Sequence, residues 1–408
     1  MTLPPPSDVD LAGLPLAGGG HLLVRRALRM LPDGARLRVY GRDATIGLDL
    51  RAWARGQGIP VERVVEVAGS PVASTSPLVA VLVRTPAAEG RWRGAERSGD
   101  AGPYGVVENP SPSWGLALRG AAVEPGGPSL HFPLATKAEV WTDEAARIYR
   151  KAAAAQWDPA TLPWDTPLDH PPEVEDAVVQ VMTYLVENEM AALLVPARFL
   201  AQVHPHFREV LQVLAVQAAD EARHIEVFSR RALLARSAPG LSTAGGQASL
   251  ATLLTEPDFA LSTFLLSVLG EGSFLTLLWF LAEHAPDALT RAIARAAAQD
   301  EARHVAFGMA HLGAHLDGDP DLRVRLVNAV TRRHQALVGT AGLNEEVHDA
   351  LLLLAAGGWD HAQLAEGAAR VTRLAHDMDE GRQQRLRLLG FDLDEAEAMS
   401  SLHTRNFM

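Results

Sequence analysis

Cysteine is absent from all 408 residues of the chain. Disulfide bonds, cysteine-ligated zinc, iron–sulfur clusters and a thiol nucleophile are therefore excluded within it. The absence is compatible with a reducing compartment, and we expect a cytoplasmic location.

Basic residues are outnumbered as well. Lysine and arginine total 37 against 49 aspartates and glutamates, which gives a formal net charge of −12 and a pI near 5.7. This balance argues against nucleic acid or an anionic membrane as the main partner. The N-terminus lacks a basic stretch followed by an apolar one, so we read no secretory signal there.

One long apolar run, at 259–283, could pass for a membrane span by its length. Glu271 lies at its middle, between Gly270 and Gly272. An ionisable side chain at that depth would be costly in lipid. We therefore interpret the run as a helix buried inside a soluble helical bundle.

Two regions of different composition follow each other along the chain. Residues 1–135 are rich in glycine and proline; short β-branched runs predict strands at 35–41 and 78–84, and amphipathic patterns predict helices at 21–31 and 46–58. The loop-rich stretch 98–128 is expected to mark the boundary. We predict an α+β protein, with a small α/β accessory domain at 1–135 and an all-α domain at 136–408. Helical periodicity predicts long helices at 173–203, 206–235, 258–284, 287–316 and 321–341, with further helices to about 388.

The pentapeptide DEARH occurs twice, at 220–224 and at 300–304. In each copy a glutamate precedes a histidine by three positions, so both side chains share one face of a helix about a turn apart. Such a pair can bind one metal ion or two neighbouring ions. A single copy is weak evidence for a metal site, whereas two copies with the same flanking Asp and Arg are much stronger.

Further glutamates lie at matching heights on the preceding helices. Glu189 and Glu221 lie 16 residues on either side of Pro205, and Glu271 and Glu301 lie 15 residues on either side of Pro286. If each proline marks a turn between two helices, both members of each pair reach the same level. Glu187 competes with Glu189 for the remaining place; the two point roughly 200° apart on a helix, and the symmetric spacing favours Glu189.

Four glutamates and two histidines at one level of a four-helix bundle predict a dinuclear carboxylate site. Oxygen-rich sites with one imidazole per ion suit iron or manganese. We expect two iron ions, with an Mn/Fe pair as the alternative. The predicted ligands are Glu189, Glu221, His224, Glu271, Glu301 and His304.

This motif set, which covers about 173–315, resembles the ferritin-like di-iron carboxylate proteins. They include ribonucleotide reductase small subunits, multicomponent monooxygenases, acyl desaturases and arylamine N-oxygenases. The resemblance implies that Asp220 orients His304 and that Asp300 orients His224, since metal-bound imidazoles usually donate their second N–H to a carboxylate. Arg223 and Arg303 would balance the buried negative charge.

The resemblance implies oxygen activation, so we expect an oxidoreductase of monooxygenase type that hydroxylates, N-oxygenates, desaturates or cleaves a small organic substrate. Arylamine N-oxygenases carry an extra histidine one turn before a ligand glutamate, where this chain has Gln217 and Ala297. Radical generation, with Tyr184 as a candidate among four tyrosines, and a merely structural metal are the alternatives. Candidate pocket residues, chosen for their position near Glu189 and Glu271, are Thr183, Val186, Leu193, Ser267, Phe274, Leu275 and Leu278.

Other histidines have simpler interpretations. His311 and His315 lie too far along their helix to share a metal with His304, and we take them as structural or solvent-facing. His204 and His206 flank a turn, and we expect them to be exposed.

The N-terminal region faintly resembles small sulfur-carrier folds of β-α-β-α-β-β type over about 10–66. Those carriers use a cysteine where this chain has Leu16-Ala17, so a docking or substrate-presenting role replaces sulfur transfer. The partners we expect are O₂ and a small molecule, with electrons from a separate reductase, from a chemical reductant or from the substrate. A homodimer is compatible with the sequence; nucleic acid and a membrane are not expected partners.

Overall fold

The computed structural model describes residues 7–64, 76–85, 92, 94–102, 105–316, 318–338 and 345–404. Parts of several expected segments lie outside these residues: the first six residues, 65–66, 103–104, 339–341 and the tail 405–408. Internal contacts divide the chain into two units. One comprises Met1–Ser98 and Gly120–Ser129, and the other comprises Gly99–Arg119 and Leu130–Met408.

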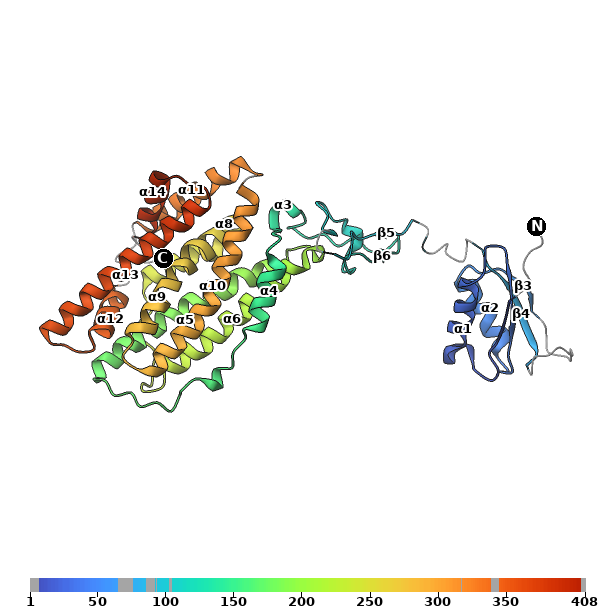
Figure 1. Ribbon diagram of the computed structural model, residues 1–408, viewed down its shortest axis with the longest axis horizontal. Coiled ribbons are helices and arrows are strands. Elements are labelled where there is room, and N and C mark those ends of the chain that lie inside the picture. Colours follow the sequence, from blue (N-terminus) through green and yellow to red (C-terminus); the bar gives the residue numbers. More distant parts are fainter. Residues whose placement is uncertain are drawn as a thin grey trace. The chain divides into compact units, whose positions relative to one another are not determined.

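The first unit is a four-stranded sheet with two helices (Figure 1). Its strands pair in the order β1-β2-β4-β3; β1 runs parallel to β2, and the other two pairings are antiparallel. In chain order the elements are β1 (Ser7–Asp10), α1 (His21–Arg29), β2 (Arg36–Tyr40), α2 (Ile46–Gly56), β3 (Val61–Val64) and β4 (Leu78–Val83). A short π-helical segment, η1 (Leu16–Gly20), precedes α1, and the two-residue strands β5 (Glu96–Arg97) and β6 (Ala122–Val123) pair with each other.

Alternating apolar residues build the core of this unit. Leu37 and Val39 of β2 and Leu82 of β4 are fully buried, as expected for strands with one covered face. Val24 of α1 and Leu50 of α2 are buried in the same cluster. The helices and strands predicted at 21–31, 35–41, 46–58 and 78–84 therefore all form, with ends within about two residues.

The second unit is almost entirely helical. Its long helices are α5 (Pro172–Leu200), α6 (Arg208–Ala232), α9 (Gly272–His284), α10 (Ala288–Leu316), α11 (Pro320–Leu337) and α13 (His361–Leu388). Shorter ones are α3 (Lys137–Val140), α4 (Ala145–Ala154), α7 (Ala244–Thr255), α8 (Phe259–Thr263), α12 (Glu345–Ala356) and α14 (Leu393–Thr404). Three-residue 3₁₀ turns occur at Pro112–Trp114, Pro159–Thr161 and Pro205–Phe207, and a π-helical segment, η7 (Phe264–Glu271), joins α8 to α9.

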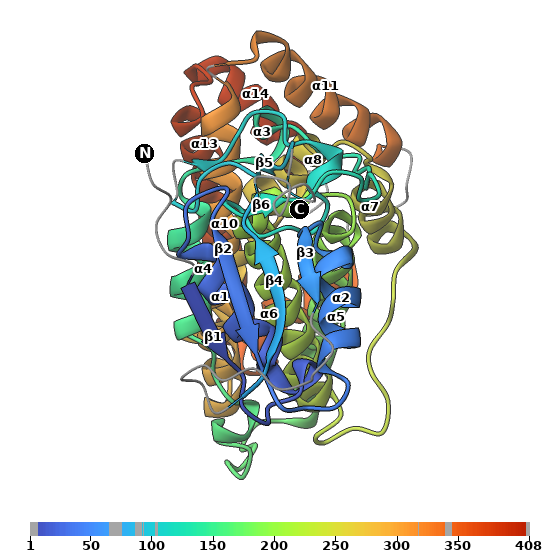
Figure 2. The same ribbon diagram turned by 90° about the vertical axis from the view of Figure 1, so that its right-hand side faces the viewer.

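Two antiparallel helix pairs form the centre of this unit. The α5 helix packs along α6, α10 packs along η7 and α9, and α6 and α10 bring the two pairs together (Figures 1 and 2). The α4 helix lies against α6 and α10, while α12 and α13 cover α5 and α9. The mostly helical structure with a small sheet is consistent with the predicted ferritin-like helical fold.

Local sequence explains where the central helices begin and end. Pro172 occupies the first turn of α5, and the chain turns at His204-Pro205, where His204 Nδ1 accepts a 3.1 Å hydrogen bond from the His206 amide. Asp287 likewise accepts a 2.7 Å bond from the Thr290 amide at the start of α10. The sequence prediction stopped at about 388 and missed α14, which follows a left-handed Gly390.

Two helical stretches are long and apolar enough to cross a membrane by length and composition, Pro172–Leu200 and Phe259–His284. Their most apolar windows are 67% and 83% buried inside the protein, as in the core of a soluble protein. The run at 259–283 is therefore a buried helix, as we interpreted it.

The expectation that His204 and His206 are exposed was wrong, since both are buried. Residues from the segment before the helices cover them. The Val107 amide donates a 3.0 Å hydrogen bond to His206 Nε2, and the Trp114 ring lies 5.5 Å from the His206 ring. A turn was taken for a surface feature because nothing local in the sequence indicates a covering segment about 100 residues away.

Candidate metal centre

Six acidic and imidazole side chains meet in the middle of the helical unit. They form two overlapping groups, Glu189–Glu221–His224–Glu301 and Glu221–Glu271–Glu301–His304, and within each group one ligand atom per residue lies within 4.8 Å of all the others. All six residues are buried. Glu221 and Glu301 belong to both groups, which is the arrangement that two bridging carboxylates between two ions require.

Each of the four central segments supplies part of this set. Glu189 comes from α5, Glu221 with His224 from α6, and Glu301 with His304 from α10. Glu271 is the last residue of η7, where the wider π-helical turn interrupts the α-helical register. Glu187, the competitor of Glu189, is half-buried and belongs to neither group.

The two histidine rings face the carboxylates with the same nitrogen. His224 Nδ1 lies 3.1 Å from a Glu221 oxygen and 3.4 Å from a Glu301 oxygen. His304 Nδ1 lies 3.0 Å from Glu221 Oε1 and 3.4 Å from Glu301 Oε2. In both rings, Nδ1 is therefore the atom directed at the space between the carboxylates.

The opposite nitrogen of each ring meets an aspartate of the other helix. His224 Nε2 lies 3.1 Å from Asp300 Oδ2, and His304 Nε2 lies 3.3 Å from Asp220 Oδ2. Both aspartates are fully buried. An aspartate that accepts from Nε2–H leaves the lone pair of Nδ1 available to a cation. The structure thus brings together the crossed Asp–His pairs implied by the sequence resemblance.

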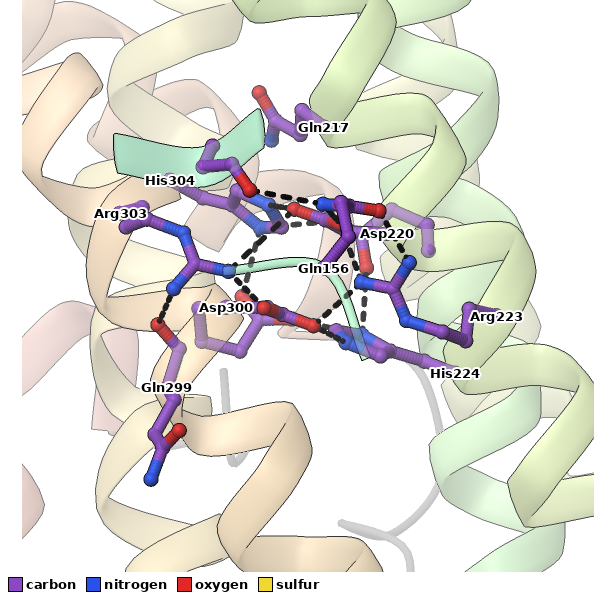
Figure 3. Close-up of polar contacts among 12 residues, drawn as sticks. Gln156, Gln217, Asp220, Arg223, His224, Gln299, Asp300, Arg303 and His304 are labelled. Atoms are coloured by element: carbon purple, nitrogen blue, oxygen red, sulfur yellow. Dashed lines mark hydrogen bonds and ion pairs between the residues drawn. The ribbon is translucent and has the colours of Figure 1, made fainter. Parts of the chain in front are cut away.

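Two arginines surround the aspartates (Figure 3). Arg223 donates to Asp220 and, at 2.8 Å, to Asp300, so it links α6 to α10. Arg303 donates to Asp300 and to the Gln299 carbonyl. Both guanidinium groups therefore lie against the two buried aspartates.

Two residues of the segment before α5 complete this layer, and sequence reasoning missed their role. Gln156 Nε2 donates a 2.7 Å hydrogen bond to Asp220, and Trp157 Nε1 donates a 2.8 Å bond to Asp300. The Trp157 ring also stacks near His224, with ring centroids 6.4 Å apart. In the sequence, the only indication of a role was a tryptophan in a proline-rich stretch before the bundle, and such a residue does not specify its partner.

Gln217 contacts the centre directly. Its Nε2 donates a 2.8 Å hydrogen bond to Glu271 Oε1, and the residue is buried. In the sequence, Gln217 stood out only as a departure from the arylamine N-oxygenase pattern. Ala297, the corresponding residue before the second motif, is buried and offers no such donor.

Burial and crowding change the proton affinities of this cluster. Burial and the charge of Glu221 raise the pKa of Glu189, and burial and the charge of Glu301 raise the pKa of Glu271. Burial alone would lower the pKa values of both histidines, but the carboxylates around them raise these values well above the usual range. When all four carboxylates are ionised, they carry more negative charge than the two imidazoles can offset, and bound cations would neutralise that excess.

Unpartnered atoms test whether cations fit. Glu189 Oε1, Glu221 Oε1, Glu271 Oε2, both oxygens of Glu301 and His304 Nδ1 are buried and make no well-aligned hydrogen bond. Buried polar atoms without partners are costly, and here they face one another. Carboxylate oxygens with one imidazole per position are ligands that suit iron or manganese. The cluster therefore fits a di-metal site.

A small cavity of about 20 Å³ adjoins the centre. Glu189, Glu271 and Glu301 form its polar side, and its apolar lining is Ala192, Leu250, Leu253, Leu266 and Phe274. Of the predicted pocket residues, Phe274 lines this cavity, and Ser267 lines a second, smaller one beside Gln217. Thr183, Val186, Leu193, Leu275 and Leu278 line neither. Thr183, for example, is occupied by hydrogen bonds with the Val179 carbonyl and the Gly240 amide.

No protein-family model matches the chain, and no curated protein matches it in sequence. Among solved structures, it is similar to R2-like ligand-binding oxidases. One is a point mutant with an aerobically reconstituted Mn/Fe cofactor, at 15% identity and a TM-score of 0.36, covering 64% of this chain and 91% of the other. Another, with its metal cofactor after photoconversion, has 16% identity and a TM-score of 0.37, with 64% and 90% covered. At these values the likeness carries no argument about activity.

Proposed function

We propose that this protein is a di-metal oxidase that activates O₂ to oxidise a small organic substrate. The observation that carries the proposal is the pair of overlapping ligand groups with two shared glutamates. Two redox-active ions bound there would supply electrons to O₂. A structural ion alone needs one closed ligand set and does not explain a second, equivalent one.

The residues of this chain would divide the work. Glu189 with His224 would hold one ion, Glu271 with His304 the other, and Glu221 and Glu301 would bridge them. With a metal ion on Nδ1, Asp220 and Asp300 would keep the proton of each imidazole on Nε2. The apolar walls formed by Leu250, Leu253, Leu266 and Phe274 exclude water from the face where substrate would react.

The type of oxidation belongs to this proposal. Hydroxylation, N-oxygenation, desaturation and bond cleavage all remain compatible with the centre. Gln217 occupies the position of the extra histidine in arylamine N-oxygenases, which favours the other reactions. Two iron ions are proposed, with Mn/Fe as the alternative, because the donor set suits both metals. The cytoplasmic location, the separate reductase and the homodimer are parts of the same proposal.

Metal titration followed by O₂ exposure tests the proposal. The full chain should bind two ferrous ions per protein and consume O₂ rapidly, with a transient optical absorption that decays. Glu271→Ala should lose one ion and the transient. Glu187→Ala is the matched control on α5, and it should keep both.

Full loading with two ions and no reaction with O₂ would sink the oxidase proposal in favour of a structural role. A long-lived radical signal after O₂ exposure, abolished by Tyr184→Phe, would instead favour radical generation. Binding of a single ion would contradict the dinuclear assignment itself.

A further inference from the structure

A second charged group is buried near the candidate metal centre, and nothing described so far explains it. Arg333 of α11 is 6% exposed. Its Nη2 donates a 2.7 Å hydrogen bond to the Ser249 hydroxyl of α7, whereas its Nη1 is buried and has no hydrogen-bond partner. Within the described part of the chain, no carboxylate forms an ion pair with it.

Two other buried arginines of this protein are held by carboxylates. Arg231 is held by two oxygens of Glu175 and one of Asp287, and Arg119 is held by both oxygens of Glu209. Buried charges are normally paired in this way, because an uncompensated charge is costly in a protein interior. Burial lowers the pKa of Arg333 to about 10, so the guanidinium still carries its charge at neutral pH.

Two more buried polar atoms without partners lie in the same region. The Tyr184 hydroxyl and the Asn188 side-chain oxygen, both on α5, make no well-aligned hydrogen bond, although the two side chains lie within reach of each other. Tyr184 interacts electrostatically with Arg333 and lies beside the Asn188 side chain. The buried Nη1 of Arg333 therefore has a hydrogen bond to donate that no described residue accepts, and the Tyr184 side chain interacts with the same guanidinium.

Two cavities adjoin these groups. Asn188 lines the cavity at the metal centre together with Glu189, and Ser249 directly precedes Leu250 of the same lining. Arg333 itself lines a second cavity of about 180 Å³ between α7 and α11, whose other walls include the exposed Thr255 and Arg332. The guanidinium can therefore be approached from the protein surface.

We propose that Arg333 anchors the carboxylate of the substrate, with Tyr184 as a second donor. The substrate would then be an organic acid with an apolar body, whose body extends along the leucine-lined cavity toward Glu189 and Glu271. This inference rests on the proposed oxidase function and names the substrate class of the same site.

The helix geometry sets the distance between the anchor and the oxidised atom. Tyr184 and Glu189 are five residues apart on α5, which corresponds to about 7.5 Å along the helix axis. The reacting atom should therefore lie several bonds from the carboxylate, not next to it. The cavity at the centre has room for about one water molecule, so its walls must move apart for a substrate to enter.

Calorimetry with matched eight-carbon probes tests the anchor. Octanoate, octanol and octylamine are titrated into the full chain, both metal-loaded and metal-free. Octanoate should bind at least about tenfold more tightly than the other two, since a buried charge-assisted contact is strong. Arg333→Met should remove this preference. Arg325→Met, which removes the same charge from another side chain of α11 that is paired with Asp258 and Asp319, should keep it.

Equal affinity for the three probes, or an unchanged preference in Arg333→Met, would overturn the proposal. A preference that vanishes without metal would also overturn it, because the carboxylate would then bind the ions. Should Arg333→Met fail to fold, Tyr184→Phe supplies the test, with an expected loss of about threefold in octanoate affinity and none for octanol. No change would again count against the anchor.

This readout needs neither metal nor O₂. Failure of the oxidase proposal would appear as absent metal loading or absent O₂ consumption with the octanoate preference intact. Failure of the anchor would appear as normal metal loading and O₂ consumption with no preference for the acid.

Discussion

The side-chain amide of Gln217 on α6 donates a 2.8 Å hydrogen bond to Glu271 at the end of η7. This contact holds one carboxylate oxygen while the other, Oε2, has no partner. Gln217 therefore fixes the orientation of a predicted ligand from a different helix.

Replacing this donor should weaken one of the two metal positions. In Gln217→Ala we expect the ion at Glu271 and His304 to bind about 10–100-fold more weakly, which is the usual effect of removing a hydrogen-bond partner of a metal ligand. Ferrous titration followed by metal analysis measures it. Gln299→Ala, an exposed glutamine on α10, is the control and should bind like the parent protein. Two equally tight ions in Gln217→Ala would contradict the positioning role.

The crossed aspartates make a second prediction. Asp300→Asn keeps the shape of the side chain but presents an N–H to His224 Nε2 in some orientations, and it removes charge that Arg223 and Arg303 neutralise. Affinity for the ion at Glu189 and His224 should fall by about 10–100-fold. Asp176→Asn, on the exposed partner of Arg236, should change nothing. Unaltered metal affinity in Asp300→Asn would show that the aspartate serves packing alone.

Stability should depend strongly on a buried ion-pair network away from the metals. Arg231 donates to Glu175 at 2.7 and 2.8 Å, to Asp287 at 2.9 Å and to Thr290 at 2.8 Å, and it is fully buried. Arg231→Met should lower the free energy of unfolding by about 3–5 kcal/mol, because it strands two buried carboxylates.

Urea unfolding of the full chain measures this loss. Arg236→Met removes an arginine that pairs with the exposed Asp176, and such surface pairs contribute about 0–1 kcal/mol. A loss in Arg231→Met no larger than in this control would refute the network's importance.

His206 should make the protein acid-sensitive. Burial and the neighbouring Arg119 lower its pKa from an ordinary 6.5 to about 4, with His204 and Arg208 acting in the same direction and Glu209 opposing them. Since the unfolded chain takes up the proton first, the stability from a neutral His206 is complete above pH 6.5 and is lost as the pH falls toward 4. Protonation would also remove the acceptor of the Val107 amide.

His206→Gln, whose side-chain oxygen can still accept that hydrogen bond, should unfold with a flatter pH dependence between 6.5 and 4. The urea midpoints of both proteins are measured at half-unit pH steps. Their difference at each pH isolates the effect of His206, because titrations common to both proteins cancel. Parallel curves would mean that His206 does not titrate in this window.

Sequence reasoning predicted the mostly helical region because helices show a regular periodicity. The spacing of Glu189 and Glu221 around Pro205 depends only on helical rise, and the structure places both glutamates in one group. Apolar alternation similarly located β2 and β4. The division of the chain into two domains, which we drew from composition, remains a prediction.

Contacts between distant segments were beyond that reasoning. Gln156 and Trp157 reach the aspartates from outside the bundle, and the burial of His204 and His206 depends on residues about 100 positions earlier. Most of the predicted pocket residues do not line the cavity, for a related reason. Leu250 and Leu253 come from α7, a short helix with little amphipathic signal, and periodicity gave no reason to place it beside Glu189.

The two halves of the centre repeat a pentapeptide but not its surroundings. Asp220 accepts a hydrogen bond from the side-chain amide of Gln156, whereas Asp300 accepts one from the indole N–H of Trp157. Gln217 donates to Glu271, and Ala297, at the corresponding position of the second motif, has no donor. Chemically equal ligand sets thus sit in unequal electric fields. Two ions of the same element would therefore be inequivalent. The two positions would be filled in a fixed order, and the ions would differ in reduction potential. In a mixed pair, each metal would prefer one of the two positions.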